Sequence, residues 1–143
     1  MGTRASKFKV NKYFSPCPIS DGDEVYRNGI FEFNITKMIE WIHKDPGDIR
    51  IEAVAVKDFC KEFSSIGEVH VDQTDISRPV ILAEIAPGQY NLIDGNHRME
   101  KARRMGLVSL MAYRLNVEQH MKFLTNKKAY VAYVEYWNSK RDD

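Results

Sequence analysis

The sequence has no long apolar run and no excess of charge of one sign. A membrane-spanning helix needs about 18 consecutive apolar residues, and no stretch of the 143 residues approaches that length. The formal net charge is +1, whereas proteins that bind nucleic acid mainly through its phosphates usually carry a clear basic excess. We therefore expect no membrane partner, and any DNA binding would depend on a local strip such as the basic segment Arg4–Lys12.

Cysteine is also scarce, because the chain contains only Cys17 and Cys60. Neither lies in a Cys-x-x-Cys motif or in a cluster of His and Cys, which argues against a zinc site. The N-terminus lacks the apolar core of a signal peptide. Two cysteines without such a signal are typical of reduced thiols, so we expect a cytoplasmic protein.

What the sequence does contain is a succession of segments with the apolar periods of helices and strands. Strands are expected at Ile49–Val56, Glu68–Val71, Val80–Ile85, Gln89–Ile93 and Val108–Leu115. Helices are expected at Ile35–Lys44 after an N-cap at Asn34, at Asp58–Ser64, Asn96–Met105 and Ala129–Trp137, and from Asn116 to about Leu124. The pattern predicts a compact α/β (α+β) fold with a small mixed sheet flanked by helices and a helical C-terminus. Residues 1–33 are expected to form an arm and a loop, and residues 34–143 a single domain.

The most informative segment is Asp94-Gly95-Asn96-His97-Arg98, where an expected strand turns directly into an expected helix. The first turn of a helix has unpaired amides and a partial positive charge, a combination that binds phosphates. Within that turn, Arg98 offers a planar fork for phosphate. His97 offers a donor or a proton shuttle, and Asn96 a donor or a cap. Asp94 is a candidate Mg²⁺ ligand or general base.

A purely structural interpretation of the same segment is a tight Asp-Gly turn, an Asn cap and a solvated arginine. The polar cluster Asp72, Asp75 and Arg78, before the buried strand, likewise has two interpretations. It either faces the site, where Arg78 would bind phosphate, or forms a polar loop.

The chain resembles the ParB/sulfiredoxin superfamily over about Ile49–Leu115. The resemblance rests on Arg78-Pro79-Val80-Ile81-Leu82, the turn through Arg98, then Ala102, Gly106 and the strand Val108–Leu115. It implies a ParB/sulfiredoxin-like fold, and the reaction that it implies differs by branch. Sulfiredoxins carry Gly-Cys-His-Arg at the turn and use the cysteine in repair, but here that position is Asn96. Partition proteins carry Gly-Glu-Arg-Arg, bind CTP and continue into a helix-turn-helix DNA domain, for which the segment after Leu115 is too short.

A third branch, ADP-dependent free-serine kinases, carries Asp-Gly-His-His-Arg, which is nearest to this sequence. That resemblance implies that Gly95, His97 and Arg98 hold phosphates and that Asp94 lies beside the transferred group. Candidates for the glutamate of that branch are Glu52, Asp72 and Asp75.

These observations predict a nucleotide-phosphate-binding protein that carries out phosphotransfer or nucleotide hydrolysis with ATP, ADP or CTP and Mg²⁺. Such an enzyme would be a kinase or an NTPase, with Asp94 and His97 as catalytic residues. Gly95, Asn96, His97, Arg98 and Arg78 would bind the nucleotide. The alternatives are a non-catalytic DNA-binding or regulatory module and a ParB-like nuclease.

Four further features each allow two interpretations. Glu84 interrupts an apolar strand and points either into a pocket or to solvent. His120 and Lys122 are expected on a solvated helix face. An aromatic stripe along the last helix either stacks on nucleobases or forms core or a homodimer contact; it comprises Tyr130, Tyr133, Tyr136 and Trp137. The basic residues Lys101, Arg103 and Arg104 either contact nucleic acid or pair with Glu100.

Overall fold

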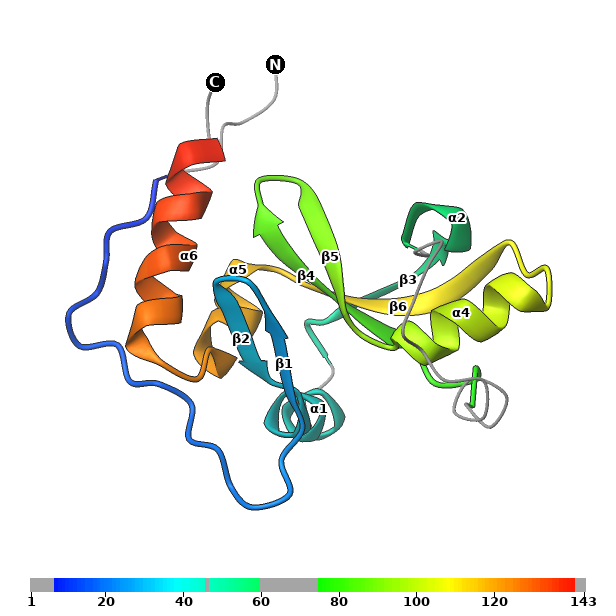
Figure 1. Ribbon diagram of the computed structural model, residues 1–143, viewed down its shortest axis with the longest axis horizontal. Helices are drawn as coiled ribbons and strands as arrows, with labels where there is room; N and C mark the ends of the chain where they lie inside the picture. The colour runs from blue at the N-terminus through cyan, green and yellow to red at the C-terminus, as the bar shows by residue number, and fades with distance from the viewer. Residues whose placement is uncertain (1–6, 46, 60–74, 141–143) are drawn as a thin grey trace. The chain divides into compact units, whose positions relative to one another are not determined.

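A computed structural model describes residues 7–45, 47–59 and 75–140 of the chain (Figure 1). The chain divides into two units that alternate along the sequence. Unit 1 is drawn from Met1–Asp48, Glu84–Tyr90 and Asn116–Asp143, and unit 2 from Ile49–Ala83 and Asn91–Leu115. Cys60, Asp72, the expected strand Glu68–Val71 and the part of the expected helix beyond Phe59 lie outside the described residues.

A four-stranded mixed sheet with the strand order β3-β6-β4-β5 lies in unit 2, except for residues Glu84–Tyr90 of its β4–β5 hairpin, which belong to unit 1. Its strands are β3 (Arg50–Ala55), β4 (Val80–Ala86), β5 (Gln89–Asp94) and β6 (Ser109–Leu115). Strand β6 pairs antiparallel to β3 and parallel to β4. The β4–β5 hairpin is followed by a helix and then by β6, so the turn between β5 and the helix lies beside the start of β4.

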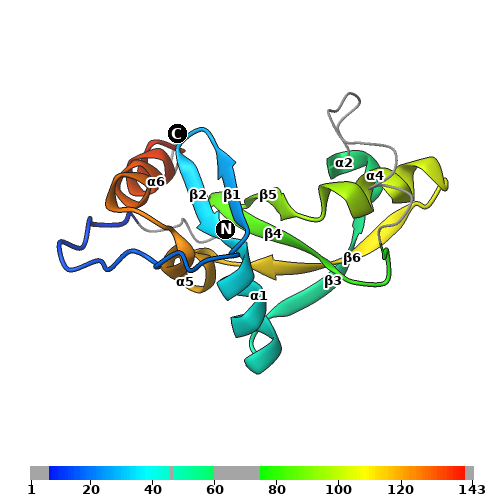
Figure 2. The same cartoon turned by 60° about the horizontal axis from the view of Figure 1, so that its bottom comes forward.

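In the described part of unit 2, two helices pack on the sheet, α2 (Val56–Phe59) and α4 (Asn96–Arg104). Figure 2 shows both on the same side of β3 and β6. Met99 and Ala102 are buried on α4, and Gly106, with φ of 74°, ends the helix through hydrogen bonds from its amide to Arg103 O and from Leu107 N to Ala102 O. This is the glycine stop that the sequence predicts.

The described residues of unit 1 form the hairpin of β1 (Val25–Asn28) and β2 (Phe31–Asn34) and four helical segments. These segments are α1 (Ile35–Lys44), α5 (Val117–His120), the 3₁₀ helix η1 (Met121–Phe123) and α6 (Lys127–Lys140). The core is strongly aromatic. The ring of Phe33 lies edge-on to His120 at 5.2 Å between centroids, and His120 lies edge-on to Tyr133 at 5.3 Å.

Helix α1 illustrates how the sequence sets the bounds of an element. Asn34 is the N-cap, and its side chain accepts a hydrogen bond from Lys37 N. The apolar stripe Ile35, Met38 and Ile42 is buried. The predicted bounds, 35–44, match the observed helix, because a polar cap and an apolar period coincide there.

The fold class predicted from the sequence is confirmed: the chain is a mixed α+β protein with a small mixed sheet and a helical C-terminal end. The hairpin β1–β2 was not expected within the predicted arm and loop of residues 1–33. The predicted division into that arm and a single domain at 34–143 stays a prediction. Among the helices of the described residues, none is both long and apolar enough to cross a membrane.

Two predicted side-chain environments are wrong. Met105, which would share the inner face of the expected helix Asn96–Met105 with Met99 and Ala102, is instead the C-cap of α4 and is 55% exposed. The helix ends one residue earlier than predicted, so Met105 leaves the buried stripe. His120, expected on a solvated face, is fully buried, because the rings of Phe33 and Tyr133 pack against it.

Candidate functional site

The predicted site lies in unit 2, where β5 ends at Asp94 and α4 begins at Asn96. We call the five residues Asp94–Arg98 the glycine turn. Gly95 is the N-cap of α4 and has no side chain that could bond to the first-turn amides. A helix whose N-terminus carries no side-chain cap presents its first amides and its positive dipole end to a ligand.

Two observations explain why residue 95 is a glycine. Its φ is 111°, in the region that side-chain-bearing residues rarely adopt. A Cβ at this position would also lie 2.5 Å from Val80 Cγ1 and 3.1 Å from Arg98 Nη2. The backbone of the turn therefore lies directly against the start of β4, with the Arg98 guanidinium beside it.

Arg98 is the unusual residue of the site, because it is 7% exposed. Its Nη2 donates to Asp94 Oδ2 at 2.9 Å, four residues back along the chain. Its Nε is buried and has no hydrogen-bond partner. A buried cation is stable only when it is paired, and Asp94 supplies that pairing while one donor of the guanidinium stays unused.

The two middle residues of the turn differ in their surroundings. Asn96 is the first helical residue and is partly exposed, and His97 is exposed. The alternative in which Asn96 caps the helix is not what the structure has, since Gly95 occupies the cap position. His97 is placed where it could reach a ligand bound at the helix N-terminus.

The segment before β4 lies close to helix α4. Arg78 is exposed, and its amide bonds back to Asp75 O at 3.5 Å. The pKa of Asp75 is held below its usual range by hydrogen bonds from the Ser77 hydroxyl and amide, and also by the charges of Arg78 and Lys101. Arg78 lies two residues before Val80, and Val80 contacts the glycine turn. Arg78 is therefore at the same end of the sheet as the glycine turn.

The described acidic candidate Glu52 forms ion pairs with arginines of the sheet and none with Arg98. Glu52 on β3 pairs with Arg50 at 2.7 Å and with Arg114 at 2.9 Å, in an ion cluster on the sheet. Asp72 lies outside the described residues. Within the described part of the chain, no group of three or more His, Cys, Asp or Glu side chains is arranged to hold a metal ion.

The remaining candidates have structural roles. Glu84 Oε2 accepts from Gly88 N at 3.0 Å and closes the β4–β5 hairpin of which it is part. The predicted pairing of Glu100 with neighbouring arginines is confirmed, with contacts of 2.6 Å to Arg103 and 2.8 Å to Arg104. The predicted core role of the aromatic stripe is confirmed for three of its members, Tyr130, Tyr133 and Trp137, which are buried.

Sequence reasoning missed that Arg98 is buried and that Val80 touches Gly95. The signal for burial was present, because Arg98 precedes Met99 and lies four residues before the inner Ala102, on the helix stripe that faces the sheet. Comparison with known proteins adds no assignment: no family model matches the chain, and no match is found among curated proteins.

Proposed function

We propose that this chain binds the phosphates of a nucleotide at the glycine turn and acts on them by phosphoryl transfer or hydrolysis. The observation that carries the proposal is the buried Arg98, which belongs to the first turn of α4 and has an unpartnered Nε. An arginine fork with an unused donor beside uncapped helix amides matches a phosphate group in charge and in geometry.

The pairing of Arg98 with Asp94 is compatible with phosphate binding. Only Nη2 donates to the carboxylate, at 2.9 Å, and guanidinium carries five N–H donors. Asp94 would therefore keep the guanidinium in place while its remaining N–H groups donate to a phosphate. The ion pair positions the arginine before the ligand arrives, which lowers the entropic cost of binding.

The chemistry of the turn would be shared by Asp94 and His97. Mg²⁺ is commonly held by one or two carboxylates together with phosphate oxygens, and Asp94 would contribute the single carboxylate on the protein side. His97, exposed at the second helical position, would donate to a phosphate oxygen or carry a proton. Asn96 and Arg78 would complete the phosphate contacts.

The proposed relationship is to the ParB/sulfiredoxin superfamily, in which the Asp-Gly-x-His-Arg turn is nearest to the free-serine kinases. The order of β4, β5, α4 and β6 and the glycine at the helix start support it. ADP and ATP are the first nucleotides to consider on this basis, and CTP is the alternative.

A thermal-shift panel with ADP, ATP, CTP and GTP, each with and without Mg²⁺, tests the proposal. A nucleotide at about one hundred times its Kd stabilises the folded state by about 2.7 kcal/mol, which raises Tm by several degrees. We expect one nucleotide to do so for the wild-type chain and for Arg103→Ala, a control at the other end of α4. Arg98→Lys, which keeps the charge but not the fork, should lose most of the shift.

A shift of equal size in Arg98→Lys would place the nucleotide elsewhere. The absence of any shift would favour a non-catalytic DNA-binding module instead. In that case the exposed lysines of the N-terminal segment would carry the DNA contacts, and a filter-binding signal that falls steeply with salt would be required. A Mg²⁺- or Mn²⁺-dependent nick in supercoiled plasmid would point to the nuclease alternative.

A further inference from the structure

Strands β3 and β6 of unit 2 have an open face on the side opposite α2 and α4. Both helices lie on one side of these strands (Figure 2), and the strand residues Val54, Leu110 and Ala112, which point toward that side, are buried. Side chains alternate between the two sides of a strand, so the residues between them point away from the helices. We call the six outward residues the open face; they are Ile51, Ala53, Ala55, Ser109, Met111 and Tyr113.

The open face carries no charged residue, although much of it is in contact with water. When one side of an antiparallel strand pair is covered, the other side normally presents polar residues to solvent. Here Ile51 is 46% exposed and Met111 is 47% exposed, and Ala53 and Ser109 are exposed as well. Contiguous apolar surface marks an interaction site more often than a bare surface, so we interpret the open face as an interface.

Side-chain size falls from one end of the open face to the other. The register of β3 and β6 places its residues opposite each other in three pairs: Ile51 with Tyr113, Ala53 with Met111, and Ala55 with Ser109. The first pair has two large side chains, the last pair has two small ones, and the middle pair has one of each. A face that tapers in this way fits a copy of itself turned end to end, because the large residues of one copy then lie over the small residues of the other.

We propose that the open face packs against the open face of a second copy of this chain, across a two-fold axis that crosses the strands at Met111. The two sheets then lie face to face with their strands nearly aligned, as in β-sandwiches. Ile51 lies over Ala55 of the partner subunit. Tyr113 lies over Ser109 of the partner subunit, where the two hydroxyl groups can share a hydrogen bond. Met111 meets its own counterpart, and its flexible thioether side chain adapts to such a contact.

Charge and size both agree with a second copy as the occupant. A two-fold interface uses the same patch on both subunits, so a face without charge causes no repulsion there, whereas a nucleic acid or an anionic membrane would require basic residues. Apolar residues that lead into β6 extend the patch, because Met105, Leu107 and Val108 are also exposed. The patch is still smaller than the about 20–30 residues per side of a standard interface, so the dimer should be weak and should dissociate on dilution. The contact uses no residue of the glycine turn and holds whether or not that turn binds a nucleotide.

Sedimentation velocity of the full chain over a wide range of concentrations tests the proposal. We expect a reversible equilibrium between monomer and dimer that ammonium sulfate strengthens, since excluded salts favour the burial of apolar surface. Met111→Lys places two like charges beside each other at the two-fold axis and should weaken the dimer at least about tenfold. Ile51→Lys should weaken the dimer as well. Ile30→Lys is the matched control, because Ile30 is an isoleucine of unit 1 with 44% exposure, and it should leave the dimer unchanged.

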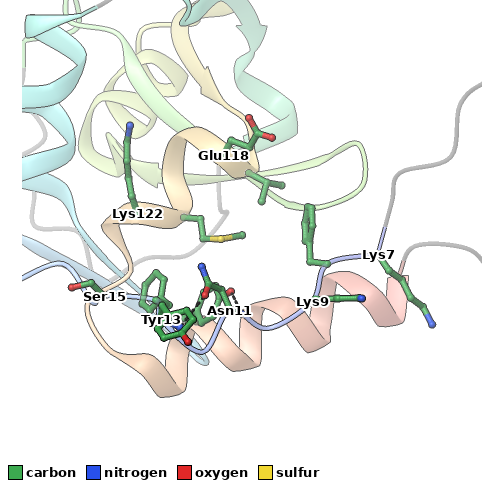
Figure 3. A pocket seen from close by; sticks show the side chains of 12 residues that line it. Lys7, Lys9, Asn11, Tyr13, Ser15, Glu118 and Lys122 are labelled. Atoms are coloured by element: carbon green, nitrogen blue, oxygen red, sulfur yellow. Dashed lines mark hydrogen bonds between the residues drawn. The ribbon is translucent and has the colours of Figure 1, made fainter.

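Chemical cross-linking locates the axis without relying on loss of binding. In a chain that carries Cys17→Ser and Cys60→Ser, Met111→Cys should be joined to its counterpart by a short bismaleimide. Tyr13→Cys, at a residue that is 78% exposed on the N-terminal segment (Figure 3), should stay monomeric under the same conditions. A chain that is monomeric at every concentration would overturn the proposal. A dimer that the lysine variants at 51 and 111 leave intact, or one that cross-links at residue 13 and not at residue 111, would overturn it equally.

Discussion

At the scale of single residues, the account depends on how Arg98 is held. The residue is buried, and its only described partner is Asp94, at 2.9 Å. Removing one member of a buried ion pair leaves the other charge without compensation, which costs about 3–5 kcal/mol. Asp94→Asn keeps a hydrogen-bond acceptor for Arg98 and removes the charge, so it separates a role in positioning Arg98 from a role in chemistry.

We predict that Gly95→Ala destabilises the protein by at least about 2 kcal/mol. The alanine would have to adopt a φ of 111° and would place its Cβ 2.5 Å from Val80 Cγ1, so backbone strain and overpacking add. Gly47→Ala is the matched control, because a Cβ there meets no atom within 4 Å. Urea denaturation followed by circular dichroism measures both; equal midpoints for the two variants would contradict the predicted contact with β4.

We predict that the buried His120 makes stability depend on pH. Burial lowers the pKa of His120 to about 4. Its Nε2 donates to Glu84 O at 2.7 Å, an acceptor that fixes the neutral tautomer, while Nδ1 has no partner. The unfolded chain takes up this proton near pH 6.5 and the folded chain only near pH 4. The stabilisation that neutral, buried His120 gives to the fold is therefore complete above pH 6.5. It is lost progressively as the pH falls toward 4, by about 3 kcal/mol in all.

Urea titrations at pH 7, 6 and 5 measure this loss. His120→Gln can still donate to Glu84 O but does not titrate, so its stability should fall less between pH 7 and 5. His43→Gln, on the exposed end of α1, should retain the wild-type pH dependence. A wild-type stability that stays constant over that interval would show that His120 is not held neutral.

At the scale of elements, helix ends decide where the functional side chains stand. Helix α1 begins at a side-chain cap, because Asn34 accepts from Lys37 N, whereas α4 begins at a glycine that offers no such bond. Helix α1 thus has a side-chain cap at its N-terminus, and its apolar stripe packs in the core. The second leaves its N-terminus available, which is the arrangement that a phosphate site requires.

We predict that Asn34→Ala costs about 2–3 kcal/mol, more than an ordinary cap. Besides capping α1, the Asn34 amide donates to Pro18 O at 3.0 Å and to Asp23 Oδ2 at 2.8 Å, and the side chain is buried. Asn116→Ala, which removes the more exposed cap of α5, should cost about 1 kcal/mol. Thermal unfolding of both variants gives the comparison, and an equal loss would show that the extra bonds contribute nothing.

Asn34→Ala should also raise the pKa of Asp23. The hydrogen bond from Asn34 is the largest of the interactions that lower the pKa of Asp23 to about 2. Without it, the pKa should rise toward 3.8, the ordinary value for aspartate. A carboxyl NMR titration measures the change, and an unmoved pKa would mean that the Ser20 amide and Lys37 suffice.

Local patterns predicted most elements of the fold, and long-range packing accounts for what they missed. Helix α1 and strands β3 to β6 were found within one or two residues, because their apolar periods end at Asn, Pro or Gly. The hairpin β1–β2 was missed, since only its second strand is buried and its first is largely exposed. The burial of His120 depends on Phe33 and Tyr133, which are distant in sequence, and no local period encodes that contact.

The candidate site, too, was predicted only in part from local sequence. The turn, its glycine and the helix start follow from five consecutive residues and were predicted. The ion pair Asp94–Arg98 could have been predicted from the i, i+4 spacing. The burial of Arg98 could have been predicted from its place on the apolar stripe of the helix, but the contact of Gly95 with Val80 could not, because it depends on how β4 lies against the turn.

At the scale of the whole molecule, the two units differ in the features that they contain. Unit 2 has most of the mixed sheet and a glycine-capped helix, where a highly charged ligand would meet backbone amides and an arginine. Unit 1 has an aromatic core around Phe33, His120 and Tyr133. Variants of the two units should therefore have separate effects: His120→Gln should leave nucleotide binding unchanged, and Arg98→Lys should leave the pH dependence that comes from His120 unchanged.

The central claim is that the glycine turn binds nucleotide phosphates through Arg98. The most direct test is a calorimetric titration of ADP, ATP and CTP, each with Mg²⁺, into the wild-type chain and into Arg98→Lys, with Arg103→Ala as control. We predict a saturable site for one nucleotide that weakens at least about tenfold in Arg98→Lys, the loss of a bidentate charged contact, and stays unchanged in Arg103→Ala. A wild-type affinity retained in Arg98→Lys, or no heat of binding with any of the three, would contradict the claim.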